Sequence, residues 1–233
     1  MDSLVEINNL TKNYSTKKAA INQLNIKIER GRIIGLLGPN GSGKTTLIKM
    51  LNGLLQPSSG NILINGNVPG VETKKIVSYL PEKTYLQNGL KVSELVDFFA
   101  DFYTDFRKDV AYGMLKSLNI ESNSKLKTLS KGTKEKVQLI LVMSRKADLY
   151  ILDEPIAGVD PAARDYILKT IINNYSENAT ILLSTHLITD IENVLDEVIL
   201  IKEGNLVMHT TVETIREEYG KSVDSYFREV FAC

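Results

Sequence analysis

One short stretch constrains this chain more than any other: residues 38–46 read Gly-Pro-Asn-Gly-Ser-Gly-Lys-Thr-Thr. It matches the pattern Gly-x-x-x-x-Gly-Lys-Ser/Thr, in which a glycine-rich loop turns its backbone N–H groups toward phosphate oxygens. The apolar segment from Arg32 to Leu37 predicts a buried strand before the loop, and Thr45 to Leu51 predicts a helix after it. Because a helix N-terminus also attracts anions, this order predicts a triphosphate-binding site.

The expected phosphate-binding residues form one continuous run: Gly38, Pro39, Asn40, Gly41, Ser42, Gly43, Lys44, Thr45 and Thr46. Within this run, we expect Lys44 to reach the β and γ phosphates and Thr45 to offer its hydroxyl to Mg²⁺. The alternative interpretation is a glycine-rich turn without a ligand. The strand before the loop and the helix after it argue against that alternative.

A second chemical feature is a pair of adjacent carboxylates, Asp153 and Glu154, directly after the apolar run from Leu149 to Leu152. The end of a buried strand is the usual position for chemistry in an open parallel sheet. We expect Asp153 to hold Mg²⁺ directly or through its waters, and Glu154 to polarise the water that attacks the γ phosphate. Alternatively, the two carboxylates only cap the following helix.

The order of apolar patterns indicates an α/β fold. Three segments, Leu4 to Asn9, Ile21 to Glu29 and Gly60 to Gly66, alternate apolar and polar residues as in a half-buried antiparallel sheet. Buried strands at Leu149 to Leu152 and Thr180 to Ser184, with a helix between them, indicate parallel pairing. We therefore expect a mostly parallel sheet with an N-terminal antiparallel β subdomain.

The middle of the chain differs from its flanks, because approximately residues 83–147 show helical periodicity without a convincing strand. We expect this stretch to be a helical lobe inserted into a single domain that spans residues 1–233. Val198 to Ile201 and Leu206 to His209 predict a hairpin, and approximately residues 210–233 predict short C-terminal helices.

Charge and composition narrow the classes of partner. The 28 basic and 28 acidic residues give zero formal net charge, so we expect no nucleic-acid partner. No window reaches the roughly 18 apolar residues of a membrane span, and the amino terminus lacks the pattern of a signal peptide. The only cysteine is Cys233, which fits a reducing compartment. We expect a cytoplasmic chain that acts on a membrane only through a partner.

Further segments appear in a characteristic order: Tyr14 in Leu-Thr-Lys-Asn-Tyr, residues 129–136 reading Leu-Ser-Lys-Gly-Thr-Lys-Glu-Lys, residues 156–161 reading Ile-Ala-Gly-Val-Asp-Pro, and His186 in Leu-Ser-Thr-His-Leu. Together with the phosphate loop and the carboxylate pair, this order resembles the ATP-binding subunits of ABC transporters over essentially the whole chain. The resemblance is to the bacterial exporter-like branch, in which a separate permease carries the substrate. It implies a P-loop NTPase core that binds ATP with Mg²⁺.

The resemblance also implies roles for single residues. Tyr14 would stack on adenine, and His186 would join Glu154 as a catalytic residue. Ser130 and Gly132 would contact the γ phosphate bound to a second ATP-binding subunit in a head-to-tail homodimer or heterodimer. Each residue has a structural alternative, because Tyr14 fits a strand, Ser130 fits a helix N-cap and a lone histidine often has only a structural role.

Two positions depart from the family pattern. Glu82 occupies the place where most members have glutamine, and Lys131 the place where a second glycine is common. A carboxylate only accepts hydrogen bonds and adds negative charge beside the triphosphate. Glu82 therefore either ligates Mg²⁺ together with Thr45 and Asp153 or turns away from it.

An aromatic cluster has two interpretations. Four of the six phenylalanines lie between residues 91 and 107, and with Tyr103 their spacing predicts a wide stripe on one helix: Phe98, Phe99, Phe102 and Phe106. The stripe either packs the helical lobe or borders a groove for a short permease helix, as the lobe does in the family.

Two other classes of function remain open. The first is a non-transport ATPase of the same fold that drives a cell-division, cluster-assembly or signalling complex. The second, a DNA-repair or translation ATPase, is disfavoured because the chain has no long coiled-coil insertion, second nucleotide domain or basic tract. In the favoured interpretation, the chain lies peripherally on the inner face of the cell membrane, bound to its permease.

Overall fold

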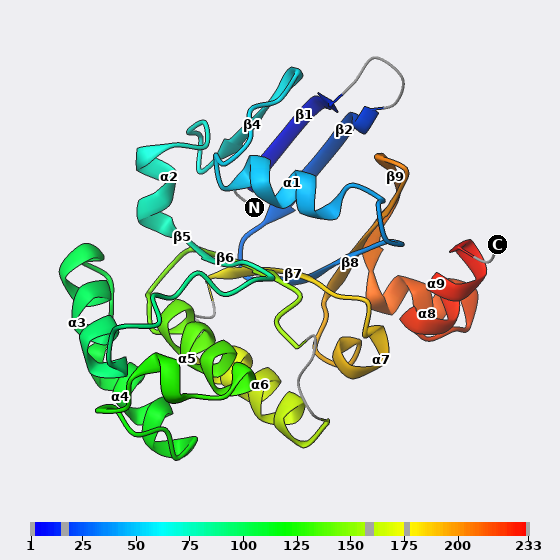
Figure 1. Ribbon diagram of the computed structural model, residues 1–233. Helices are drawn as coiled ribbons and strands as arrows, with labels where there is room; N and C mark the ends of the chain where they lie inside the picture. The colour runs from blue at the N-terminus through cyan, green and yellow to red at the C-terminus, as the bar shows by residue number, and fades with distance from the viewer. Residues whose placement is uncertain (1–2, 15–18, 157–160, 175–177, 232–233) are drawn as a thin grey trace.

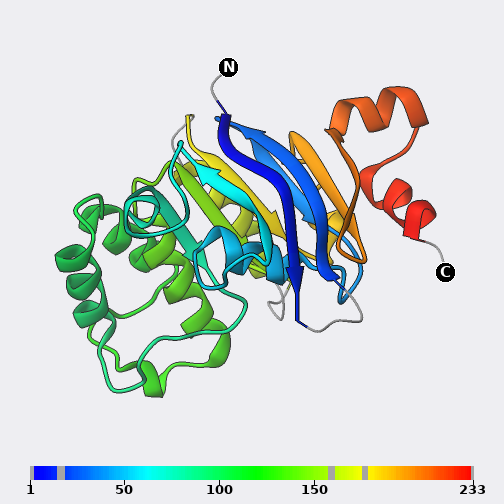
Figure 2. The same cartoon turned by 90° about the horizontal axis from the view of Figure 1, so that it is seen from above.

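The computed structural model describes residues 3–14, 19–156, 161–174 and 178–231. Two sheets lie at the centre of the molecule, and most of the helices pack on the larger of the two (Figure 1). Viewed from above, the helices between residues 92 and 143 lie on one side of the sheets and the C-terminal helices on the other (Figure 2).

The larger sheet has six strands in the order β5-β6-β7-β3-β8-β9. All neighbours in it are parallel except β8 and β9, which pair antiparallel as the expected hairpin. The strands are β3 (Ile33–Leu37), β5 (Val77–Leu80), β6 (Leu149–Asp153), β7 (Thr180–Ser184), β8 (Glu197–Lys202) and β9 (Asn205–Thr211). Every residue of β3, β6 and β7 is buried, as expected of parallel strands covered on both faces.

The smaller sheet is antiparallel, with the order β2-β1-β4. Its strands are β1 (Ser3–Asn13), β2 (Ala19–Glu29) and β4 (Ser59–Ile64). Apolar side chains of these strands, such as Leu4, Ile26 and Ile62, are buried against the helix α1 (Lys44–Leu51) and one face of the larger sheet. The predicted fold class, an α/β core with an antiparallel N-terminal sheet, is confirmed.

The larger sheet separates two hydrophobic cores because successive side chains of a strand point to opposite faces. In β6, Ile151 faces the smaller sheet, whereas Leu152 faces the helices. In β3, Leu36 and Leu37 divide in the same way. The sheet is thus held from both sides, and the ends of its strands keep fixed positions.

The helices complete the layers. After α1 come α2 (Val71–Ile76), α3 (Val92–Phe102), α4 (Lys108–Ser117), the short 3-10 helix η1 (Leu126–Thr128), α5 (Lys131–Met143), α6 (Pro161–Asn174), α7 (Ile188–Ile191), α8 (Val212–Tyr219) and α9 (Val223–Phe231). No helix within the described ranges is both long enough and apolar enough to cross a bilayer.

The expectation that one helix carries the whole aromatic stripe is wrong at its C-terminal end. α3 ends at Phe102, and Phe106 lies beyond it. The backbone leaves the helix because it pairs with the segment after α5: Lys146 N donates to Asp105 O at 3.0 Å, and Phe106 forms a bridge with Arg145. The stripe is therefore split between a helix and a loop.

The two parts of the stripe also differ in exposure. Phe99 is buried and packs against Phe106, with 5.9 Å between the ring centroids. Phe98 and Phe102 stack on each other on the outer side of α3 and are 59% and 69% exposed. Only the inner part of the stripe therefore fills the core.

Arg145 joins this helical region to the larger sheet. Its buried guanidinium donates to Val77 O at 2.6 Å and to Lys75 O at 2.8 Å, and it pairs with Asp105 Oδ1 at 3.1 Å. It also stacks over the Tyr103 ring, 3.9 Å from the centroid. One side chain thus connects the start of β5, α2 and the loop after α3.

We expect Arg145→Met to lower the free energy of unfolding by about 3–5 kcal/mol, because it leaves Asp105 and several carbonyls without their donor. Urea unfolding followed by circular dichroism measures this loss. The matched control is Arg216→Met at an exposed position of α8, where we expect a change within about 0.5 kcal/mol. Equal midpoints for the two variants would show that Arg145 does not anchor the helical region.

Candidate nucleotide-binding site

The glycine-rich loop connects β3 to α1 at the carboxyl ends of the parallel strands, where ligands bind in sheets of this kind. Gly43 has a φ of 111°, a conformation that side chains disfavour, and a Cβ there would lie 2.5 Å from Ala20 O. At Gly38 a Cβ would lie 2.2 Å from Ile201 O. The loop therefore packs too closely against its neighbours to accept a side chain at either position.

Lys44 bends back over this loop. Its Nζ donates to Gly38 O at 2.7 Å and to Pro39 O at 3.2 Å. Burial lowers the pKa of Lys44, while the charges of Glu154 and Asp153 act in the opposite direction. The ammonium group is thus held by carbonyls of the loop, within electrostatic reach of the two carboxylates.

A cleft of about 230 Å³ lies beside the loop. The described residues that line it are Ala20, Asn40, Gly41, Ser42, Gly43, Lys44, Thr45, Thr46, Glu82, Asp153 and Glu154. The structure thus brings together most of the expected phosphate-binding run, both carboxylates and Glu82. Gly38 and Pro39 contribute to the cleft through the carbonyls that hold Lys44.

The position of Asp153 is set by the neighbouring strand. Asp153 and Ser184 are partners in the β6–β7 register, and Ser184 Oγ donates to Asp153 Oδ1 at 2.5 Å. Burial raises the pKa of Asp153. The nearby carboxylates of Glu82 and Glu154 raise it further, against the opposite effects of Ser184 and Lys44. Three carboxylates thus face one lysine, an excess of negative charge that a divalent cation would balance.

Glu154 adopts an unusual backbone conformation, with a φ of 53° that few residues other than glycine accept. Its amide donates to Ser184 O at 3.0 Å, which holds the turn in place. Its side-chain Oε2 lies 3.0 Å from Nδ1 of His186. Strain of this kind is often found where a side chain must be aimed at a reaction.

The remaining predicted residues lie at the rim or farther away. Tyr14 is 64% exposed, and its hydroxyl lies 3.4 Å from Thr46 Oγ1, beside the cleft. Ser130 caps α5 by accepting from Thr133 N at 3.1 Å, while neither Ser130 nor Gly132 is among the described residues that line this cleft. Residues 157–160 of the segment after the carboxylates lie outside the described ranges.

Sequence reasoning missed two residues that support the site. Ser184, which orients Asp153, ends the strand next to β6, but which strands are neighbours is not visible in the sequence. Gln138 on α5 is buried, and it accepts from Tyr85 N at 3.3 Å and donates to Pro81 O at 3.4 Å. A lone glutamine within the apolar run from Val137 to Met143 was the available signal for Gln138.

We expect Gly38→Ala to abolish ATP binding, because relief of a 2.2 Å contact with a backbone oxygen must displace the phosphate loop. Isothermal titration calorimetry with MgATP and a thermal unfolding scan measure the two effects. Gly89→Ala is the matched control, because a Cβ there has open space and the backbone is unstrained. Wild-type affinity in Gly38→Ala would show that the loop tolerates movement.

Comparison with known proteins agrees with this geometry. The sequence profile of the family described as ABC transporter matches residues 21–157. The SkfA peptide export ATP-binding protein SkfE of Bacillus subtilis (strain 168) is 35% identical over 221 residues, covering 92% of both chains.

Solved structures show the same likeness. One structure, described as the ATP-binding subunit of an ABC transporter, superposes with a TM-score of 0.88 and 30% identity, covering 98% of this chain and 99% of the other. A second is cbiO1 from Clostridium perfringens, part of the ABC transporter complex cbiONQ, with a TM-score of 0.77, 27% identity and coverage of 99% and 95%. The family match covers more than half of the chain and the relatives match nearly all of it, so the chain belongs to the ATP-binding, ATP-hydrolysing subunits of ABC transporters.

Proposed function

We propose that this chain hydrolyses MgATP in the cleft beside the phosphate loop and thereby drives export through a separate membrane permease. The observation that supports it most is the arrangement of Glu154. Glu154 lines the same cleft as the phosphate loop, and its carboxylate is hydrogen-bonded to His186. A positioned carboxylate beside a phosphate site is suited to accept a proton from an attacking water.

In the proposed reaction, the loop amides and the Lys44 ammonium hold the β and γ phosphates, and Tyr14 stacks on the adenine. Glu154 accepts the proton of the water that attacks the γ phosphate, while the hydrogen bond from His186 keeps that carboxylate oriented. Stacking on an aromatic ring is worth about 1–3 kcal/mol by analogy with bases bound to proteins. The tyrosine thus contributes affinity and the two polar residues contribute turnover.

The residues of the cleft fit Mg²⁺. Thr45, Asp153 and Glu82 all line it and offer oxygen atoms, the ligand type that Mg²⁺ prefers. The described residues contain no group of three or more histidine, cysteine, aspartate or glutamate side chains placed to hold a metal ion by themselves. When bound, Mg²⁺ would neutralise part of the negative charge of the phosphates.

We propose that Ser130 and Gly132 contact the nucleotide that is bound to a second subunit. Both lie at the start of α5, where free N–H groups favour an anion, but the cleft of their own chain does not include them. A head-to-tail dimer would place this helix start over the triphosphate bound to the other subunit. ATP would then close the dimer, and hydrolysis would let it reopen.

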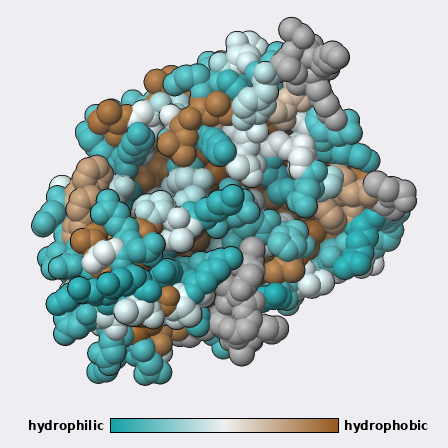
Figure 3. Space-filling view, viewed as in Figure 1, coloured by the Kyte–Doolittle hydropathy of each residue, from teal (hydrophilic) through white to brown (hydrophobic). Residues whose placement is uncertain are grey.

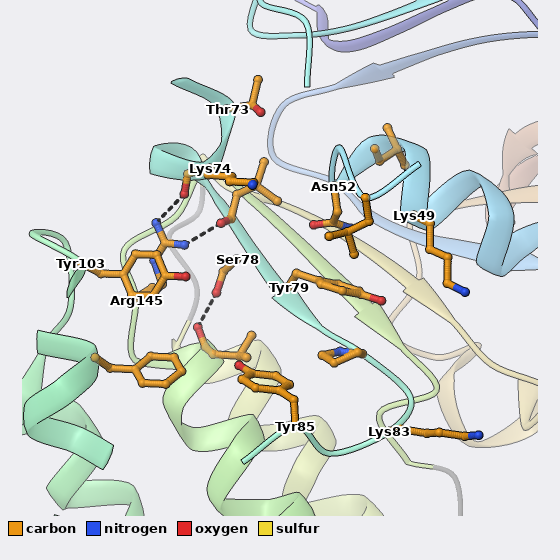
Figure 4. Close-up of a pocket in the computed structure, with 16 residues that line it drawn as sticks. Lys49, Asn52, Thr73, Lys74, Ser78, Tyr79, Lys83, Tyr85, Tyr103 and Arg145 are labelled. Carbon is orange, nitrogen blue, oxygen red and sulfur yellow. Dashed lines mark hydrogen bonds between the residues drawn. The ribbon is translucent and has the colours of Figure 1, made fainter. Parts of the chain in front are cut away.

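We propose that the permease docks in a groove of about 520 Å³ between the larger sheet and the α3–α5 region (Figure 4). We infer that this region, residues 83–147, is the helical lobe of a single domain. The segment from Pro81 to Tyr85 joins both sites, because Glu82 lines the nucleotide cleft while Pro81, Lys83 and Tyr85 line the groove. A partner seated in the groove would thus move a residue of the cleft.

Tyr79 lines the groove and interacts electrostatically with carboxylates of the cleft. Burial together with the charges of Asp153 and Glu82 raises its pKa to about 12. The phenol therefore keeps its proton and contributes a neutral polar group to the wall of the groove.

Export is supported by SkfE, which is named for peptide export. Through the permease, the chain would lie on the cytoplasmic side of the membrane. The direct test is to tag this chain in its native cell, isolate membranes and identify the co-purifying proteins by mass spectrometry. We expect a polytopic membrane protein, whereas a soluble partner alone would favour the non-transport class.

A further inference from the structure

The charged side chains of the groove are all of one sign. Among the sixteen described residues that line it, the charged ones are Lys49, Lys74, Lys83 and Arg145. The chain as a whole has equal numbers of basic and acidic residues, so this excess is local. Figure 4 shows Lys49 and Lys83 at one end of the groove with Tyr79 between them, and Lys74 toward the end that holds Arg145 and Tyr103.

Within the described part of the chain, the three lysines have no partner for their charge. Arg145 is satisfied by backbone carbonyls and Asp105, but the ammonium groups of Lys49, Lys74 and Lys83 form no hydrogen bond or ion pair with another described residue. All three are exposed. The neighbouring Lys75, in contrast, has a partner for its charge, because it pairs with Glu72 at 2.7 Å.

The rest of the groove is largely apolar and aromatic. Tyr79, Phe99 and Tyr103 form part of its wall, and Tyr85 and Leu54 line it while remaining 53% and 60% exposed. The space-filling view shows further hydrophobic side chains reaching the surface near α2 (Figure 3). An occupant of this groove must therefore present apolar side chains to the wall and negative charge to the rim.

We propose that the groove receives an acidic, amphipathic helical segment of the permease, whose apolar face covers the aromatic wall and whose carboxylates pair with Lys49, Lys74 and Lys83. The inference rests on the proposed function and adds the chemistry of the docking segment. A concave wall favours inserted side chains, whereas a membrane surface is flat. Complementary charge at the rim mainly sets the rate and specificity of association.

The first test maps the contact chemically. The complex purified from native membranes is treated with a carbodiimide, which joins a lysine amine to a carboxylate only where the two are in contact, and is then digested for mass spectrometry. We expect links from Lys49, Lys74 or Lys83 to aspartate or glutamate side chains of one cytoplasmic segment of the permease. Links from these lysines to no permease carboxylate would overturn the proposal.

The second test measures the effect of charge. We expect the triple variant Lys49→Glu, Lys74→Glu and Lys83→Glu to recover at least tenfold less permease than the wild type in the same purification. The matched control carries Lys27→Glu, Lys116→Glu and Lys169→Glu, which change the net charge equally at exposed positions that are not among the described groove-lining residues. MgATP affinity and thermal unfolding of the isolated triple variant show that its cleft and fold are intact.

The outcomes separate the two proposals. Equal recovery of permease by the groove variant and the wild type would overturn the acidic segment and leave the proposed function standing. Failure of the wild type to recover any membrane protein would overturn the proposed function itself. A third outcome would overturn the acidic segment in favour of a lipid surface. In it, permease recovery falls only for the groove variant, and the isolated wild type floats with anionic vesicles but not with neutral ones.

Discussion

Glu154→Gln is expected to lower kcat for ATP hydrolysis by about 10²–10⁴-fold, the usual contribution of a general base, while the dissociation constant for MgATP stays within about threefold. The amide keeps the shape of the side chain but does not accept a proton. The phosphate contacts of the loop and Lys44 are unchanged, so binding persists. Steady-state release of phosphate and a fluorescent nucleotide titration measure the two quantities.

This variant also tests the proposed dimer. With turnover blocked, MgATP is expected to hold two subunits together, and gel filtration with light scattering would show a dimer for Glu154→Gln and a smaller dimer fraction for the wild type. Glu121→Gln on the exposed surface is the matched control and should behave as wild type. Full hydrolysis by Glu154→Gln would remove this residue from the catalytic role.

Lys44→Ala is expected to raise the dissociation constant for ATP by about 100-fold or more. The substitution would remove the two charge-assisted hydrogen bonds proposed between Lys44 and the β and γ phosphates. Each is worth about 1.5–3 kcal/mol, and each 1.4 kcal/mol corresponds to about tenfold in affinity. The same substitution removes the donor that holds Gly38 O and Pro39 O. Calorimetric titration of ATP measures the affinity.

Lys49→Ala is the matched control for Lys44→Ala. Both lysines lie on α1, but Lys49 lines the groove rather than the cleft. We expect its ATP affinity to stay within about twofold of the wild type. Equal weakening by the two substitutions would indicate a general effect of positive charge on α1, not a contact between Lys44 and phosphate.

The parts of the site that were predictable are those encoded in a continuous run of residues. The strand, loop and helix around Lys44 follow one another in the sequence, and Asp153 and Glu154 directly follow an apolar run. The contact of Glu154 with His186 was expected from the family resemblance and from the place of His186 two residues past Ser184, and the structure places the two side chains 3.0 Å apart. The roles of these residues in catalysis stay predictions.

The parts that were not predictable depend on which distant segments meet. Ser184 reaches Asp153 only because β7 pairs with β6, and Gln138 reaches Tyr85 only because α5 packs under the loop after β5. Phe106 follows the helical spacing of the stripe, but pairing with Arg145 draws its backbone out of the helix. Local periodicity carries no information about these long-range contacts.

Short elements were missed for a different reason. α2 and α7 contain six and four residues, which is too few for a helical pattern to repeat. Their ends are fixed by contacts with the rest of the fold. The lysines of the groove were likewise visible as residues, but their convergence on one surface appears only in three dimensions.

The most direct test of the account is vanadate-sensitive ATP hydrolysis by this chain purified with its permease in lipid nanodiscs, measured beside the isolated chain and beside the same complex carrying Glu154→Gln. We predict turnover that the permease increases and that Glu154→Gln reduces to background. Hydrolysis that is the same with and without the permease, or that survives Glu154→Gln, would contradict the claim that this cleft drives transport.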